Sequence, residues 1–124
     1  MRLQHAAVTF PPGRDEEIRA FYGGVLGLAE TDVPAEVAER GWIWFLTSEP
    51  GVELHFIPAA IPPDPARMHH FCLETGDVAA VRERLAGAGV SWKAPEGIIA
   101  ARERIFVRDP VGNLVEFVQV LAAE

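Results

Sequence analysis

An internal repeat is the feature that most constrains the fold of this chain. The apolar residues and turn signals of residues 3–57 predict the order strand, helix, strand, strand, strand, and residues 70–121 predict the same order again. The segment between them, residues 58–68, contains four prolines, which exclude a central strand or a helix interior. We therefore predict two similar modules joined by a linker.

The length of 124 residues suits one domain that contains both modules. We expect an α+β fold in which module one covers residues 1–57, the linker covers 58–68 and module two covers 69–124. Each module carries one helix, and Asp15 and Asp77 are placed to cap the N-termini of these helices. The first helix is predicted by a stripe of apolar residues at helical spacing: Ile18, Phe21, Tyr22, Val25 and Leu26. A short strand is expected at Val90–Lys93 in module two.

A histidine opens the first strand of each module, and a glutamate lies in its last strand. His5 and Glu53 are 48 residues apart, and His70 and Glu116 are 46 residues apart. Each glutamate stands between two apolar residues, so it either faces solvent or needs a partner that offsets the cost of burial. Any one of the four would pass for an ordinary packing or surface residue. Their recurrence in the same frame of both modules predicts a shared site.

Two imidazoles and two carboxylates form a ligand set for Zn, Ni, Co, Mn or Fe that leaves positions open for water or substrate oxygens. We therefore predict that these four residues bind a divalent metal ion of unknown identity. His55 shares a strand face with Glu53, and His69 falls outside the repeated frame. We interpret both histidines as packing residues.

Several motifs resemble the vicinal oxygen chelate superfamily, which includes glyoxalase, bleomycin-resistance and extradiol dioxygenase proteins. The motifs are Leu3-Gln4-His5-Ala6-Ala7-Val8, Phe21-Tyr22-Gly23-Gly24-Val25-Leu26-Gly27-Leu28, Val52-Glu53-Leu54, His70-Phe71-Cys72-Leu73 and Asp109-Pro110-Val111-Gly112-Asn113-Leu114-Val115-Glu116-Phe117. The resemblance covers nearly the whole chain. It implies that the modules form a curled, half-open, eight-stranded mixed sheet with the helices outside. It also implies that the first-strand histidine and last-strand carboxylate of each module are the metal ligands, and that the protein is a homodimer.

Lactoylglutathione lyase is the member of that superfamily whose ligand set most resembles that of this chain. The resemblance implies a metal-dependent lyase or isomerase that transfers a proton next to a chelated carbonyl of a small oxygenated substrate. Glu116 or Glu53 would then be the catalytic base, and Glu116 is the preferred candidate. Arg104, which could pair with an anionic group, and Trp44, which could form an aromatic wall, are the candidate substrate-binding residues.

Two other functions stay open at this point. His5, His70 and Glu116 alone would form the facial triad of an Fe(II) extradiol dioxygenase, although the extra carboxylate of Glu53 counts against that reaction. The third interpretation is a metal-free protein that binds a small molecule or confers antibiotic resistance.

Composition narrows the partners and the compartment. The formal net charge of -7 opposes a nucleic-acid partner, because nucleic-acid binding needs a basic face. Cys72 is the only cysteine, which excludes an intrachain disulfide and fits a reducing compartment. The sequence has neither a signal-peptide pattern nor a long uncharged apolar run. We expect a cytoplasmic protein that binds a small molecule and neither nucleic acid nor a membrane.

Overall fold

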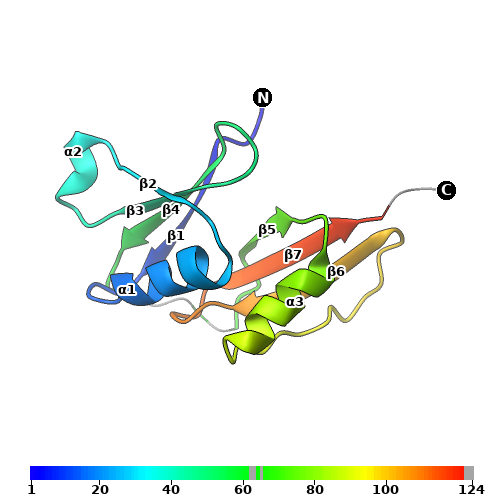
Figure 1. Cartoon of the computed structure of the whole chain (residues 1–124). Helices are drawn as coiled ribbons and strands as arrows, with labels where there is room; N and C mark the ends of the chain where they lie inside the picture. Colours follow the sequence, from blue (N-terminus) through cyan, green and yellow to red (C-terminus); the bar gives the residue numbers. More distant parts are fainter. Residues whose placement is uncertain (62–63, 65, 122–124) are drawn as a thin grey trace. The chain divides into compact units, whose positions relative to one another are not determined.

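The computed structural model describes residues 1–61, 64 and 66–121, which form two compact units (Figure 1). Unit 1 comprises Met1–Pro65 with Pro110–Asn113, and unit 2 comprises Ala66–Asp109 with Leu114–Glu124. Each unit has its own sheet and its own helix, so the α+β class predicted from the sequence is confirmed. Pro62, Pro63 and Pro65 of the predicted linker lie outside the described residues.

Unit 1 contains a four-stranded sheet in the order β1-β4-β3-β2. Its strands are β1 (His5–Phe10), β2 (Glu30–Thr31), β3 (Ile43–Leu46) and β4 (Glu53–Pro58). β1 and β4 run parallel, whereas β3 is antiparallel to both of its neighbours. Its helical segments are α1 (Asp15–Ile18), the π-helix η1 (Arg19–Val25) and α2 (Ala35–Ala38).

The alternation of side chains along the strands gives this sheet one apolar and one polar face. Phe45 and Phe56 lie on the apolar face, are almost completely buried, and pack edge to face with ring centroids 5.8 Å apart. Tyr22 of η1 covers Phe56 at 4.4 Å, and Ile18 of α1 is buried as well. The helical stripe predicted from the sequence therefore packs into the core of unit 1, on one face of the sheet.

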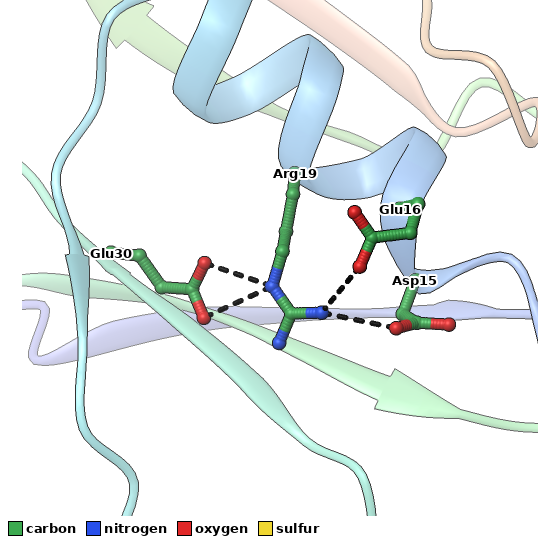
Figure 2. A network of polar contacts seen from close by, with 4 residues as sticks. All are labelled: Asp15, Glu16, Arg19 and Glu30. Atoms are coloured by element: carbon green, nitrogen blue, oxygen red, sulfur yellow. Dashed lines mark hydrogen bonds and ion pairs between the residues drawn. The ribbon is translucent and has the colours of Figure 1, made fainter.

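The helix start in unit 1 differs from the prediction. Asp15 is the first helical residue and does not cap the helix, because Arg14 holds the cap position without a side-chain hydrogen bond. The Asp15 carboxylate pairs instead with Arg19 at 3.0 Å. Arg19 also pairs with the carboxylates of Glu16 and of Glu30 in β2 (Figure 2). This network ties the helix to the edge strand, and the Glu30 carboxylate raises the pKa of Arg19.

Unit 2 contains a three-stranded sheet in the order β5-β7-β6. Its elements are β5 (His70–Glu74), α3 (Val78–Gly87), β6 (Arg102–Arg108) and β7 (Leu114–Val120). β5 and β7 are parallel, β6 and β7 are antiparallel, and α3 lies beside β6 and β7 (Figure 1). The Asp77 side chain accepts a hydrogen bond from the Ala80 amide at 3.1 Å, which confirms the predicted cap.

The described residues form one strand fewer than the eight predicted from the sequence. They contain seven strands in two sheets, and the strand expected at Val90–Lys93 is reduced to one bridge between Lys93 and Phe106. Val90 instead completes the end of α3, where its amide donates to the Leu85 carbonyl. None of the described helices is both long enough and apolar enough to span a membrane.

Candidate metal site

The polar face of unit 1 carries His5, Trp44, Glu53 and His55. In the register of the sheet, His5 lies opposite Glu53, and Trp44 lies opposite His55. Because residues paired across strands share a face, these four side chains project on the side away from the aromatic core. The predicted ligand pair of module one is therefore on one face of one sheet.

His55 is the central residue of this face. Its ring is stacked between Trp44, at a centroid distance of 3.8 Å, and His5, at 4.1 Å. His55 Nε2 donates to Glu53 Oε1 at 3.1 Å, since an ionised carboxylate can only accept. His55 is only 6% exposed, so the packing interpretation holds. What the sequence did not reveal is that this packed histidine is also the hydrogen-bond partner of Glu53.

His5 has a different polar partner. Its Nδ1 donates to the side-chain carbonyl oxygen of Gln4, and the Gln4 amide in turn lies 3.4 Å from Glu53 Oε1. This contact places the proton of a neutral His5 on Nδ1 and leaves Nε2 with a free lone pair. Gln4 thus orients His5. Its position next to the histidine in the sequence does not indicate this role.

His70 stands at the equivalent place in unit 2, and both of its ring nitrogens face oxygen acceptors. Nδ1 donates to the Met68 carbonyl at 2.7 Å. Nε2 lies 3.0 Å from Glu116 Oε1. A neutral imidazole has only one N–H, so a His70 that donates to Met68 presents a lone pair to the carboxylate. Two lone pairs that converge at this distance need a cation between them, either a proton or a metal ion.

The Glu116 carboxylate has two further neighbours. Arg104 Nε donates to Oε2 at 3.2 Å, and Cys72 lies directly opposite Glu116 in the β5–β7 register. Partial burial of the thiol, followed by the charge and the hydrogen bond of Glu116, raises the pKa of Cys72 to about 12. At neutral pH the thiol is therefore a hydrogen-bond donor and not a thiolate. Glu116 is 9% exposed and has a partner for each oxygen.

The four residues predicted as metal ligands are thus divided between the units. The structure pairs His70 with Glu116, but it places Glu53 against His55 and His5 against Gln4. Among the residues that the structure describes, no group of three or more His, Cys, Asp or Glu side chains is arranged to hold a metal ion. Convergence of all four on one point stays a prediction.

Of the two predicted substrate-binding residues, Trp44 lies on the polar face of unit 1, and Arg104 lies beside Glu116 in unit 2. Trp44 stacks on His55, and its indole Nε1 is buried without a hydrogen-bond partner among the described residues. Arg104 is held by Glu116 and by the ring of Phe106, whose centroid is 5.7 Å from the guanidinium carbon. Their role toward a substrate is untested by these contacts.

Comparisons with known proteins now decide the family. Residues 2–117 match the model of the Glyoxalase/Bleomycin resistance protein/Dioxygenase superfamily. The chain belongs to this superfamily. A solved structure of a protein from Bacillus anthracis that is assigned to the glyoxalase family has 28% sequence identity and a TM-score of 0.87, and the match covers 97% of this chain and 95% of that chain. The motifs quoted above had indicated the same superfamily.

Other superfamily structures share the fold at lower identity. Lactoylglutathione lyase from Agrobacterium tumefaciens is 20% identical with a TM-score of 0.69, and the match covers 95% of this chain and 92% of that chain. TnmS3, an antibiotic binding protein from Streptomyces sp. CB03234, is 21% identical with a TM-score of 0.68, with 97% and 96% covered. No curated protein matches the sequence significantly. The superfamily therefore fixes the fold and leaves the activity open.

Divalent metals are common in this superfamily, and the donor atoms of each unit suit one. Ligand nitrogens and oxygens lie about 2.0–2.2 Å from such an ion, so two neighbouring ligands at right angles are about 3 Å apart. The 3.0 Å between His70 Nε2 and Glu116 Oε1 matches that separation. The Nδ1 contacts of His70 and His5 also match the usual arrangement, in which a ligating histidine donates its other N–H to an oxygen. Unit 2 therefore fits part of a metal site in its donor atoms and in their spacing, and unit 1 fits in the orientation of His5.

Proposed function

We propose that this protein is a metal-dependent lyase or isomerase that transfers a proton next to the carbonyl of a small oxygenated substrate. The observation that carries the proposal is the geometry of His70. Its Nδ1 donates to the Met68 carbonyl, and its Nε2 lies 3.0 Å from Glu116 Oε1, so that the lone pairs of these two atoms face each other. A divalent cation between the two atoms would be stabilised by both lone pairs, and in its absence a proton on Nε2 fills the same role.

Under this proposal, His5, His70, Glu53 and Glu116 would hold the metal. A divalent ion bound there would stabilise negative charge that develops on a chelated substrate oxygen. His5 and His70 suit the role through Nε2, because Gln4 and Met68 occupy their Nδ1 atoms. His55 does not suit it, since its Nε2–H already donates to Glu53.

We assign the proton transfer to Glu53 and not to Glu116, the base preferred from the sequence. The Oε1 atom of Glu53 accepts from His55 and from the Gln4 amide, and its Oε2 has no partner among the described residues. Both oxygens of Glu116, by contrast, are engaged by His70 and Arg104. Glu53 would take the proton from the carbon next to the carbonyl and return it to the adjacent carbon, so the reaction is an isomerisation without an external reductant or oxidant. His55, fixed by ring stacking, would hold the Glu53 carboxylate in place.

The test is turnover of the hemithioacetal of methylglyoxal and glutathione by protein loaded separately with Zn²⁺, Ni²⁺, Co²⁺, Mn²⁺ or Fe²⁺. We expect activity with at least one metal, its loss on chelation and a decrease of about 100-fold or more in His70→Gln, because a ligand is removed. Absence of turnover with all five metals contradicts the lyase. Ring opening of a catechol by the iron-loaded protein would assign the dioxygenase reaction instead.

A second candidate, a metal-free binding protein, is favoured by one observation in unit 1. The Trp44–His55–His5 stack presents aromatic surface, and the Trp44 indole N–H is a buried donor with no acceptor in the described part of the chain. A ligand oxygen could satisfy it after a small movement. Elemental analysis of protein purified without chelator separates the candidates, since the lyase requires a stoichiometric divalent metal and the binding protein does not.

A further inference from the structure

Arg104 is a largely buried cation that contacts the same carboxylate as His70. The Arg104 and Glu116 side chains are 15% and 11% exposed, and Arg104 Nε donates to Oε2 at 3.2 Å. His70 Nε2 faces the other oxygen, Oε1, at 3.0 Å. The two carboxylate oxygens therefore have different partners, and only Oε1 is turned toward the histidine.

One aromatic ring supports both partners of Glu116. Phe106 lies opposite Glu116 in the β6–β7 register, and its ring packs edge to face with His70 at 5.2 Å. The Arg104 guanidinium lies over the same ring, 5.7 Å from its centroid. Arg104 and His70 are thus held at fixed places on either side of the Glu116 carboxylate.

We infer that Arg104 is a positioning residue, which fixes Glu116 with Oε1 toward His70 and so prepares the carboxylate to bind a metal ion. The inference rests on the metal site of the proposed function and assigns Arg104 a role other than substrate binding. A guanidinium that is mostly buried and already paired with a carboxylate is poorly available to an anionic substrate. Outer partners of a ligating carboxylate typically change metal affinity by about 10-fold to 100-fold when they are removed.

The experiment measures the affinity of the folded, metal-stripped protein for Co²⁺ alone, by calorimetry and by the visible absorption of the bound ion. We expect Arg104→Gln to weaken Co²⁺ binding by about 10-fold to 100-fold. Arg104→Lys, which keeps the charge but loses the planar fork, should fall between Arg104→Gln and the unaltered protein. Arg102→Gln is the matched control, because Arg102 is an exposed arginine two residues earlier on the same face of β6, and it should bind Co²⁺ normally.

Circular dichroism of each metal-free variant shows whether it is folded, and Arg104→Lys keeps the test decisive if Arg104→Gln unfolds. Unchanged or tighter Co²⁺ binding by the folded Arg104 variants overturns the positioning role and leaves the proposed function standing. Equal weakening by Arg102→Gln also overturns it, because general charge would then explain the effect. Failure of the unaltered protein to bind Co²⁺ overturns the proposed function and this inference together.

Discussion

Unit 1 and unit 2 are built alike but have different registers between their first and last strands. His5 lies directly opposite Glu53, whereas His70 lies opposite Leu114 and Glu116 lies opposite Cys72. In both units the histidine contacts the residue two positions beyond its direct partner. In unit 1 that residue is His55, on which His5 stacks, and in unit 2 it is Glu116.

The comparison teaches that equivalent places in a duplicated fold need not carry the same chemistry. By register, the counterpart of Glu116 is His55, and the counterpart of Cys72 is Ala7. Unit 1 consequently has a carboxylate that accepts from His55 and Gln4, and unit 2 has a carboxylate between a histidine and an arginine. We expect the two glutamates to differ in role for this reason. The following experiments test that difference.

Removal of a core ring from either unit should cause the largest loss of stability. Phe56 in unit 1 and Phe117 in unit 2 are 0% and 3% exposed. Replacing either by alanine should lower the free energy of unfolding by about 3–5 kcal/mol, because a cavity is left behind. Urea denaturation followed by circular dichroism measures the loss, and Ile98→Ala, at a residue that is 99% exposed, is the control. One shared transition is expected for a single domain, and two separate transitions would contradict that prediction.

Substitution of Glu53 and of Glu116 should have different effects on kcat and on the dependence of activity on metal concentration. Glu53→Gln should lower kcat by about 100-fold to 10,000-fold at saturating metal, because the general base is lost. Glu116→Gln should weaken metal binding, and a large part of its activity should return at high metal concentration. Steady-state kinetics over a range of metal concentrations measures both effects. Equal kcat values for the two variants at saturating metal would contradict the assignment of separate roles.

The thiol of Cys72 should titrate far above its ordinary value of 9.0, at about 12. Because the folded state disfavours the thiolate, the free energy of unfolding should decrease as the pH rises from about 9 toward about 12. The rate of alkylation by iodoacetamide against pH reports the titration. In Glu116→Gln the midpoint should move down while staying above 9.0, since burial remains.

A matched control for this titration moves the thiol to the other unit. The double substitution Ala7→Cys and Cys72→Ala puts the thiol opposite His55 and not opposite a carboxylate. Its midpoint should lie below that of Cys72. An inflection near 9.0 for Cys72 itself would show that the Glu116 environment differs from the one described.

The smallest effect is expected at Arg19, an arginine of unit 1 that pairs with three acidic side chains. Its side chain is 38% exposed, so its ion pairs with Asp15, Glu16 and Glu30 are screened by water (Figure 2). Arg19→Ala should lower the free energy of unfolding by less than about 1 kcal/mol, and the loss should shrink in 1 M salt. Urea denaturation at low and high salt measures it. A loss of several kcal/mol that salt does not reduce would contradict this account of the network.

The sequence predicts the fold well because the signals for it are local. The stripe that includes Ile18 and Tyr22 identifies the first helix, and Asp77 identifies the start of α3. Val90–Lys93 was predicted as a strand from local composition, but whether a short segment pairs depends on its neighbour, and only Lys93 finds one. Asp15 was predicted as a cap, but Arg19 lies one turn away and competes for its carboxylate.

The site is predicted only in part, because contacts between strands depend on register. Matching Val52-Glu53-Leu54 with Val115-Glu116-Phe117 makes the two glutamates look equivalent. Sequence spacing cannot show that the register between the first and last strands differs by two residues between the units. The alternation rule does put His55 on the face of Glu53. That signal could have identified the hydrogen bond between them. The contact of Arg104 with Glu116 crosses two antiparallel strands and has no comparable signal.

The most direct test of the metal account is the protonation of the histidine rings, read from a long-range ¹⁵N–¹H NMR spectrum before and after addition of Zn²⁺. The account predicts that His5 and His70 keep their proton on Nδ1 and that Zn²⁺ shifts their Nε2 resonances, while His55 retains its Nε2–H bond to Glu53. Unchanged His5 and His70 resonances at saturating Zn²⁺, or loss of the Nε2–H of His55, would contradict it.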